Sequence, residues 1–199
     1  MANVNAPFGF RHVGSISGSG PSFVQVRRKI AQAYATKIYF GDAVVPVTST
    51  ATGYIAQATA GSVALAGIFV GCRYLSVSTG RWVYSPYYPG SDANGDIDAY
   101  LIANPDALFE VQADSTGLPF AKIGQNIQLN VGAGGNTLNG QSGMYVSGTP
   151  ATTATYPFIL VDVVTTPPGA PGTDATSGYN IVQVGFNNEI FKAGITGIS

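Results

Sequence analysis

The segment from Gly67 to Gly90 constrains the fold more than any other part of the sequence, because it has the pattern of a β-hairpin. Residues 67–75 are rich in β-branched and aromatic side chains, and the Ser-Thr-Gly run at 78–80 is typical of a tight turn. Residues 81–90 then return as a second strand that ends in an aromatic, proline-rich corner. The segment contains the only Cys and the only Trp of the chain, but no pair of groups suited to acid–base or nucleophilic chemistry. The pattern therefore indicates a role in shape and contact.

The composition extends this pattern to the whole chain. The 199 residues include 26 Gly and 12 Pro, which supply turns, and Val and Ile outnumber Leu, which favours pleated strands. We expect an all-β protein, an antiparallel β-sandwich of jelly-roll-like order, with less than about a tenth of its residues in α-helix. Another Greek-key sandwich or a closed barrel would fit the same spacing. The candidate strands are residues 22–30, 37–40, 43–47, 53–58, 67–75, 81–85, 98–103, 107–113, 124–131, 142–147, 156–164 and 179–188.

The two ends of the sequence differ from its middle. Residues 1–21 combine two prolines with a Gly- and Ser-rich run, which favours an extended N-terminal arm that becomes ordered on a partner. A single sandwich domain is expected over 22–188, with a surface loop at 165–178 where Pro and Gly replace strand-forming residues. Residues 189–199 are expected to form a C-terminal arm.

Charged residues are scarce and unevenly placed. They make up 10% of the chain, whereas about 25% is usual. Either partners cover part of the surface, or uncharged Ser, Thr, Asn and Gln side chains supply its polarity. The basic run Arg27, Arg28 and Lys29 lies in a segment without acids, and the stretch 92–114 contains acids without bases. This asymmetry could align one subunit with another. Alternatively, the two segments could form two solvated faces or pair within one molecule. Nucleic-acid binding is poorly supported, because one basic run in a chain of net charge −1 is a weak footprint.

One acidic segment resembles a calcium site without meeting its requirements. Asp92, Asp96 and Asp98 begin like an EF-hand loop, but Ile97 and Ala103 stand where the loop requires Gly and Glu. An EF-hand is therefore rejected, although a cation site of another kind at this turn stays open. Asp96 and Asp98 would lie on one face of a strand, because they are two residues apart.

The remaining ionisable groups do not suggest catalysis. His12 is the only histidine, which disfavours a catalytic triad or a multi-histidine metal site. Cys72 has no partner for an internal disulfide and is expected to be a small buried hydrophobe. Asp106 and Glu110, or Asp96 and Asp98, could meet in space as glycosidase carboxylates do, but acids at turns and strand ends are the favoured interpretation. We expect no enzyme activity, no cofactor and no metal ion.

The sequence contains neither a targeting signal nor a membrane segment that can be recognised. The first residues lack the charged start and apolar run of a signal peptide, and no run of about 18 apolar residues occurs. We therefore expect synthesis in the cytoplasm of a host cell and no membrane partner.

Several short motifs, taken in order, resemble the capsid decoration (cement) proteins of tailed phages. They lie at 2–11, 37–44, 67–74, 85–90, 107–112 and 184–192, so the resemblance covers the whole chain. One departure is that His12 follows Arg11, where the family often has Arg-Pro. The resemblance implies a jelly-roll protein on the outside of an HK97-like shell, with no catalytic residues to carry over.

The residue pattern and the resemblance lead to the same functional expectation. We expect a virion structural protein that binds the exterior of an assembled capsid and bridges neighbouring major capsid protein subunits, stabilising the DNA-filled head. Further copies of the chain, as a dimer or trimer, are expected partners. The alternatives are a phage tail or fibre protein and a glycan-binding β-sandwich, because exposed aromatic rings can stack on sugars. The expected interface residues are Phe8, Phe10, Arg11, Arg27, Arg28, Lys29, Trp82, Tyr84, Tyr87, Tyr88 and Phe191.

Overall fold

The structure is a computed structural model that describes residues 3–20, 24–48, 53–195 and 197, and it is built almost entirely of strands. Strands account for 39% of the residues and helix for 2%. In the described part of the chain the helix is one 3-10 turn, η1, at Phe120–Lys122. All pairings between the named strands are antiparallel, so the all-β antiparallel fold expected from composition is confirmed.

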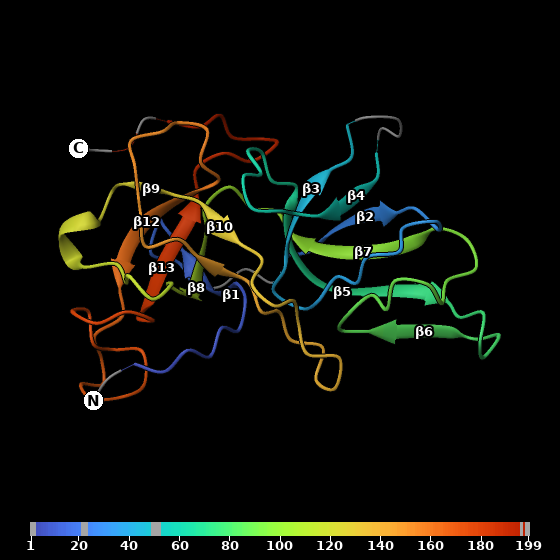
Figure 1. Cartoon of the computed structure of the whole chain (residues 1–199). Coiled ribbons are helices and arrows are strands. Elements are labelled where there is room, and N and C mark those ends of the chain that lie inside the picture. Colours follow the sequence, from blue (N-terminus) through green and yellow to red (C-terminus); the bar gives the residue numbers. More distant parts are fainter. Residues whose placement is uncertain (1–2, 21–23, 49–52, 196, 198–199) are drawn as a thin grey trace.

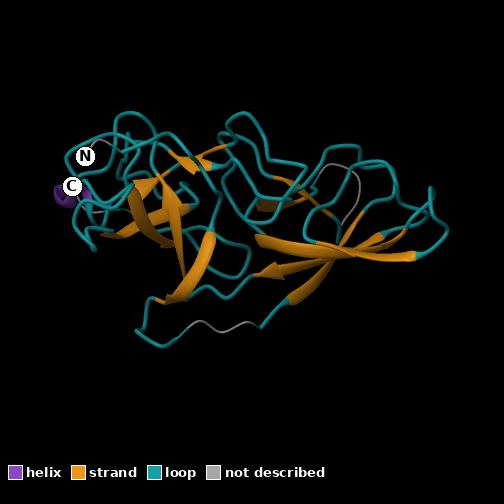
Figure 2. Cartoon of the chain, turned by 90° about the horizontal axis from the view of Figure 1, so that it is seen from below, coloured by secondary structure: helices purple, strands orange, loops and turns teal. Residues whose placement is uncertain are grey.

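The strands form two main sheets, which lie side by side along the molecule (Figures 1 and 2). Sheet A contains, in spatial order, β1 (Arg11–Ser15), β8 (Ala107–Gln112), β13 (Ile181–Phe186), β12 (Phe158–Val163) and β9 (Asn126–Ile127). Sheet B contains β2 (Val26–Ile30), β7 (Ile97–Ile102), β5 (Gly67–Leu75), β3 (Ala43–Pro46) and β4 (Ile55–Gln57), with β6 (Trp82–Ser85) paired to β5. A third, small sheet pairs β10 (Leu129–Asn130) with β11 (Tyr145–Val146).

Apart from β1, which no candidate strand covers, these strands match the candidate strands closely, but their order does not confirm a jelly roll. The two main sheets have five and six strands, and η1 lies at the outer end of sheet A (Figure 2). The predicted strand 37–40 is reduced to isolated bridges at Ile38 and Phe40. Local alternation identified the strands, whereas strand order depends on pairings between distant segments.

Two hydrophobic cores support the sheets. The first lies against sheet A and contains a group of aromatic rings, in which Phe109 meets Phe186 edge-on with ring centroids 5.1 Å apart. The second lies against sheet B and includes Phe69 and Leu101. Strands of sheet B also reach the first core through the apolar side chains of Ala43, Ile68 and Ile102. The sheets are therefore joined by strands that contribute to both cores.

The predicted hairpin is confirmed as β5 and β6. Cys72 lies opposite Ser85 and Leu75 opposite Trp82, and the turn contains Gly80 with a φ of 64°. Gly71 has a φ of 147° beside a register shift, and a Cβ there would lie 3.1 Å from the backbone oxygen of Ser85. Glycine at this position therefore lets β5 bend while both of its neighbours stay paired.

The predicted N-terminal arm is not confirmed, because its described residues belong to the body. Residues 11–15 are β1, an edge strand of sheet A, and the side chain of Phe10 is buried in the first core. Further back, Asn3 donates hydrogen bonds to the backbone oxygens of Asp174 and Gly178. These contacts tie the first residues to the 165–178 loop. Residues 1–2 and 21 of the predicted arm lie outside the described residues.

The predicted C-terminal arm also lies against the body over its described part. Ile190 donates a backbone hydrogen bond to Leu65, and Asn126 donates a side-chain hydrogen bond to the backbone oxygen of Ile195. Residues 196 and 198–199 lie outside the described part. The 165–178 segment has no named strand, as predicted, and its residues 165–169 are exposed.

Candidate interaction surface

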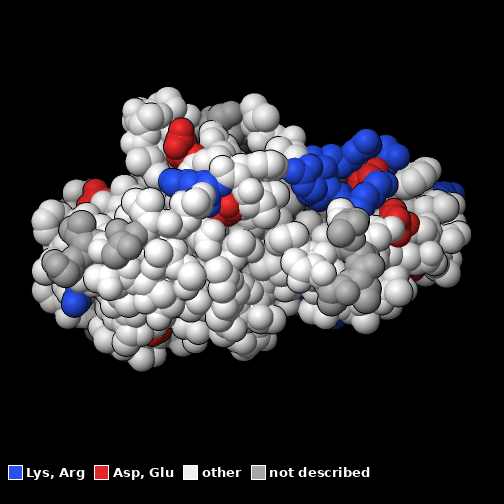
Figure 3. Space-filling model, turned by 90° about the horizontal axis from the view of Figure 1, so that it is seen from above, with Lys and Arg blue, Asp and Glu red and all other residues white. Residues whose placement is uncertain are grey.

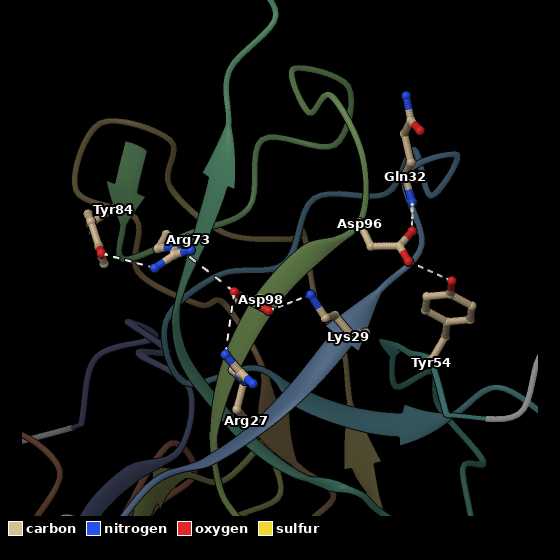
Figure 4. Close-up of polar contacts among 8 residues, drawn as sticks. All are labelled: Arg27, Lys29, Gln32, Tyr54, Arg73, Tyr84, Asp96 and Asp98. Atoms are coloured by element: carbon tan, nitrogen blue, oxygen red, sulfur yellow. Dashed lines mark hydrogen bonds and ion pairs between the residues drawn. The ribbon is translucent and has the colours of Figure 1, made fainter. Parts of the chain in front are cut away.

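The outer face of sheet B carries a row of charged and aromatic side chains. Lys29 on β2 lies opposite Asp98 on β7, which lies opposite Arg73 on β5, which in turn lies opposite Tyr84 on β6. Register partners in adjacent antiparallel strands present their side chains on the same side of the sheet. Four strands thus bring these groups together (Figure 4).

Asp98 is the centre of this row and is shared by three cations. Its carboxylate lies 2.6 Å from Lys29 Nζ, 3.9 Å from the nearest Arg27 nitrogen and 3.9 Å from Arg73 Nε. The hydrogen bond from Lys29 lowers the pKa of Asp98, and the charges of Arg27 and Arg73 lower it further, while burial acts in the opposite direction. Asp98 is therefore ionised at neutral pH, and one negative charge faces three positive charges.

Arg73 connects the charged row to two exposed aromatic rings on β6. Its guanidinium carbon lies 4.4 Å from the ring centroid of Trp82 and 5.9 Å from that of Tyr84. A guanidinium nitrogen of Arg73 also donates to the hydroxyl of Tyr84 over 3.4 Å. Trp82 is 57% exposed and Tyr84 is 70% exposed. The name "basic face" is used below for Arg27, Lys29 and Arg73 around Asp98, together with Trp82 and Tyr84.

The charge on this side of the molecule is concentrated over sheet B. Figure 3 shows Lys and Arg gathered there, whereas most of the surface in that view is free of charge. Pairing within one molecule explains part of the sequence asymmetry, because Arg11 also pairs with Glu110 on the neighbouring strand. The alternatives left open by the sequence are therefore resolved in part, because basic and acidic segments do meet inside one chain.

The acidic turn at 92–98 places its carboxylates on protein donors. Asp92 accepts hydrogen bonds from the Ser76 hydroxyl at 2.6 Å and from the Ser78 backbone at 2.9 Å. Asp96 accepts a hydrogen bond from the Tyr54 hydroxyl at 2.6 Å (Figure 4). Within the described ranges, no group of three or more His, Cys, Asp or Glu side chains is arranged to hold a metal ion.

Two predicted interface residues belong to the cores instead, which corrects the prediction. Phe10 is packed among the aromatic rings of the first core, and Tyr88 is fully buried in the second. The hydroxyl of Tyr88 donates to the backbone oxygen of Tyr34 over 2.7 Å. Their hydrophobicity suited a core as well as an interface, and sequence alone could not separate the two.

The other predicted residues fall into four separate places. Trp82, Tyr84, Arg27 and Lys29 meet in the basic face, as described above. Arg28 points its guanidinium toward the exposed ring of Phe191, with 6.0 Å to the centroid. Tyr87 is half-buried and stacks on Tyr39, with ring centroids 5.8 Å apart.

Phe8 and Arg11 form the fourth place. The Arg11 guanidinium lies 5.5 Å from the Phe8 ring centroid, and both residues line a shallow pocket of about 290 Å³. Phe40, which is 41% exposed, is also part of its wall. This pocket is separate from the basic face, so the predicted residues do not make one continuous surface.

Sequence reasoning did not bring Arg73 and Asp98 together, and it did not single out the exposed Leu138. Arg73 and Asp98 lie on neighbouring strands, and only the cross-strand register shows that they meet. Leu138 is 95% exposed at the end of a loop in which Asn136 accepts a hydrogen bond from its backbone amide. The alternation of β-strand residues could have placed Asp98 on an outer face, but it does not identify the partner strand.

Cys72 is buried, as predicted, and burial raises its pKa to about 12, so the thiol is protonated at neutral pH. Over the ranges that the structure covers, no helix has the length and apolar character needed to cross a bilayer.

Comparisons with known proteins add no assignment. No protein-family model matches the chain, and no curated protein or solved structure matches it significantly. The functional interpretation therefore depends on the geometry of this surface and on the sequence resemblance.

Proposed function

We propose that the protein is a virion structural protein that binds the outside of an assembled phage capsid and bridges neighbouring major capsid protein subunits. The proposal assigns it binding and no chemical reaction. Support comes from the sequence resemblance to capsid decoration proteins, from an antiparallel β body with few charges, and from an exposed aromatic and cationic surface.

The observation that carries the proposal is the exposure of Trp82 and Tyr84 beside Arg73. Trp, Tyr and Arg are the residue types that most often dominate the binding energy of protein interfaces. The two rings are exposed by 57% and 70%, and their contacts with Arg73 hold them in place before binding. A side chain that is already ordered loses less conformational entropy when a partner covers it.

The position of β6 at the edge of sheet B also favours a protein as the binding partner. Among the described residues β6 pairs only with β5, so it forms an edge of sheet B (Figure 1). An edge strand with large aromatic side chains offers both backbone groups and apolar area to a neighbour.

Bridging would stabilise a shell by mass action. A ligand that binds intact neighbouring subunits, and not dissociated ones, shifts the equilibrium toward the intact shell. Many copies on a symmetric particle also reinforce one another through multivalency, so each contact can be modest. We expect particles that lack the protein to lose DNA at a lower temperature than complete particles.

The test is co-sedimentation of the protein with assembled capsids that lack it. Replacing Trp82 and Tyr84 together by Ala should strongly reduce the bound fraction. Phe120→Ala is the matched control, because Phe120 is also 70% exposed but lies in η1, at the outer end of sheet A (Figure 2). Equal heat resistance of particles with and without the protein would contradict the proposed role.

A second candidate function is binding of glycans, alone or as part of a phage tail or fibre. The same exposed rings of Trp82 and Tyr84 favour it, because aromatic faces stack on sugar rings. A glycan-binding protein should bind oligosaccharides as a free subunit. Binding to a glycan panel without binding to capsids would favour this second function.

A further inference from the structure

The basic face has more positive charge than its own carboxylate can neutralise. Arg27, Lys29 and Arg73 converge on Asp98, so the four groups have a net charge of about +2 when all are ionised. Their side chains are 67%, 48% and 35% exposed, whereas that of Asp98 is 8% exposed. The surplus positive charge therefore lies on the outside, where a partner can reach it.

Arg73 is the cation best prepared to bind an anion. Trp82 and Tyr84 lie against its guanidinium. Its Nε is buried and faces Asp98 at 3.9 Å, so the terminal guanidinium nitrogens are the donors left for a partner. A guanidinium presents several N–H donors in one plane, and this plane matches the two oxygens of a carboxylate. An arriving carboxylate would find donors already oriented.

The dimensions of the face favour a short segment with few charges. Four adjacent strands at a spacing of about 4.8 Å span roughly 14 Å, which is the width of a few residues of extended peptide. The row ends at Tyr84, beside the free edge of β6, where apolar side chains of such a segment can lie against Trp82. The basic face therefore presents both positive charge and aromatic surface to such a peptide segment.

A protein carboxylate fits this face better than a nucleic acid does. Nucleic-acid binding draws on many phosphate contacts along a basic stripe. Here only three cations surround Asp98, and the chain as a whole has a net charge of −1, so the face is too small to follow a phosphate backbone. Separate carboxylates can instead lie beside Asp98, each next to one of the cations.

A second copy of the chain is a poorer source of such carboxylates. Asp92, Asp96 and Asp174 accept hydrogen bonds from neighbouring Ser, Tyr and Thr side chains, and Glu110 is paired with Arg11. These acids are already held by donors of their own chain, and the exposed Asp106 and Asp162 lie far apart in the sequence and do not form an acidic segment.

From these observations we infer that the basic face binds an acidic peptide segment of a partner protein, with Arg73 as the main carboxylate receptor and Arg27 and Lys29 as its flanking cations. The inference rests on the proposed function only in taking that partner to be a shell protein. It can be tested on the isolated protein, without capsids.

The sequence provides a probe within the site, because Trp82 is the only Trp of the chain. A short acetylated oligoglutamate peptide, titrated into the protein, should change Trp82 fluorescence in a saturable way, and an oligoglutamine peptide should not. Raising NaCl from about 0.05 M to about 0.5 M should weaken binding, because exposed charge pairs are screened. Isothermal titration calorimetry gives a second readout that does not depend on Trp82.

Variants locate the binding to the face. Arg73→Gln, and separately Arg27→Gln with Lys29→Gln, should weaken oligoglutamate binding by about tenfold or more. Lys122→Gln is the charge-matched control, since Lys122 lies in η1 at the outer end of sheet A (Figure 2), and it should bind like the unaltered protein. Circular dichroism and a thermal melt of each variant separate lost binding from lost folding.

Three results would overturn the inference. The first is the absence of binding to oligoglutamate in both readouts. The second is tighter binding to oligothymidylate, which would indicate nucleic acid, or to oligogalacturonate, which would indicate an acidic glycan. The third is equal loss of binding in Lys122→Gln. Capsid binding without oligoglutamate binding would reject this inference alone, whereas the reverse result would reject only the proposed function.

Discussion

Phe10 stacks on Phe158 with ring centroids 4.4 Å apart and ring planes 18° from parallel. This contact joins the N-terminal segment to strand β12 in the middle of the first core. The segment before β1 is therefore part of the first core against sheet A, and its removal should lower the free energy of unfolding.

Phe10→Ala should lower the free energy of unfolding by about 3–5 kcal/mol, because it removes a buried ring and leaves a cavity among aromatic neighbours. Urea denaturation followed by circular dichroism measures the change. Phe8→Ala is the control. Because Phe8 is only half-buried, this variant should show a much smaller decrease in the free energy of unfolding. Equal losses for the two variants would mean that Phe10 is not in the core.

Deleting residues 2–15 should destabilise the whole body. The deletion removes Phe10 from the first core and β1 from the edge of sheet A, which exposes the backbone of β8 to solvent. The midpoint of a thermal melt should fall clearly, or the cooperative transition should disappear. An unchanged midpoint would instead support the extended arm that the composition suggested.

Asp42→Asn should make the protein more stable at neutral pH. Asp42 is 1% exposed, and burial raises its pKa above the ordinary value, although hydrogen bonds from Ser142, Tyr39 and Gln57 oppose the shift. Asp42 Oδ2 accepts from the Tyr39 amide at 2.8 Å and from Gln57 Nε2 at 2.7 Å, and an amide oxygen can accept both.

The pH dependence of this variant follows from the direction of the shift. Because the folded pKa is the higher one, ionisation of Asp42 removes stability as pH rises from about 4, the unfolded value, through the folded pKa. The advantage of Asp42→Asn should be absent below that window and constant above it. Denaturation curves across this range measure it, and an advantage that grows toward acid pH would contradict the assignment.

Gly67→Ala should destabilise the start of β5. Gly67 has a φ of 139°, and a Cβ at this position would lie 2.7 Å from the backbone oxygen of Ile102 on the neighbouring strand. The free energy of unfolding should fall by more than about 1 kcal/mol, because backbone strain and a clash with the neighbouring strand act together. Gly20→Ala is the control, because a Cβ at Gly20 would meet nothing within 4 Å. Similar denaturation midpoints for the two variants would argue against the clash.

Local patterns were sufficient to predict the strands of the body. The strand-forming and turn residues of 67–85 predicted the hairpin β5–β6, and the excess of Val and Ile with many Gly and Pro predicted the near-absence of helix. Such features depend on neighbours a few residues away, so a sequence contains them directly. Strand β1 was missed because Gly and Ser make its surroundings resemble a flexible segment, and its partner β8 lies far along the chain.

Local sequence patterns were also insufficient to separate interface residues from core residues. The sequence indicated Trp82, Tyr84 and the basic run as contact residues, but it also selected Phe10 and Tyr88, which the cores bury. Hydrophobic side chains suit a core and an interface equally, and only packing separates the two.

By itself the sequence determined the all-β class, the positions of most strands and the residue types available for contact. The tertiary structure alone decided that Arg73 and Lys29 share Asp98 and that Trp82 and Tyr84 flank Arg73. The physical reason is that each of these contacts depends on the cross-strand register of β2, β7, β5 and β6. Register is set by the joint packing of segments that are distant in the sequence, and no local pattern contains it.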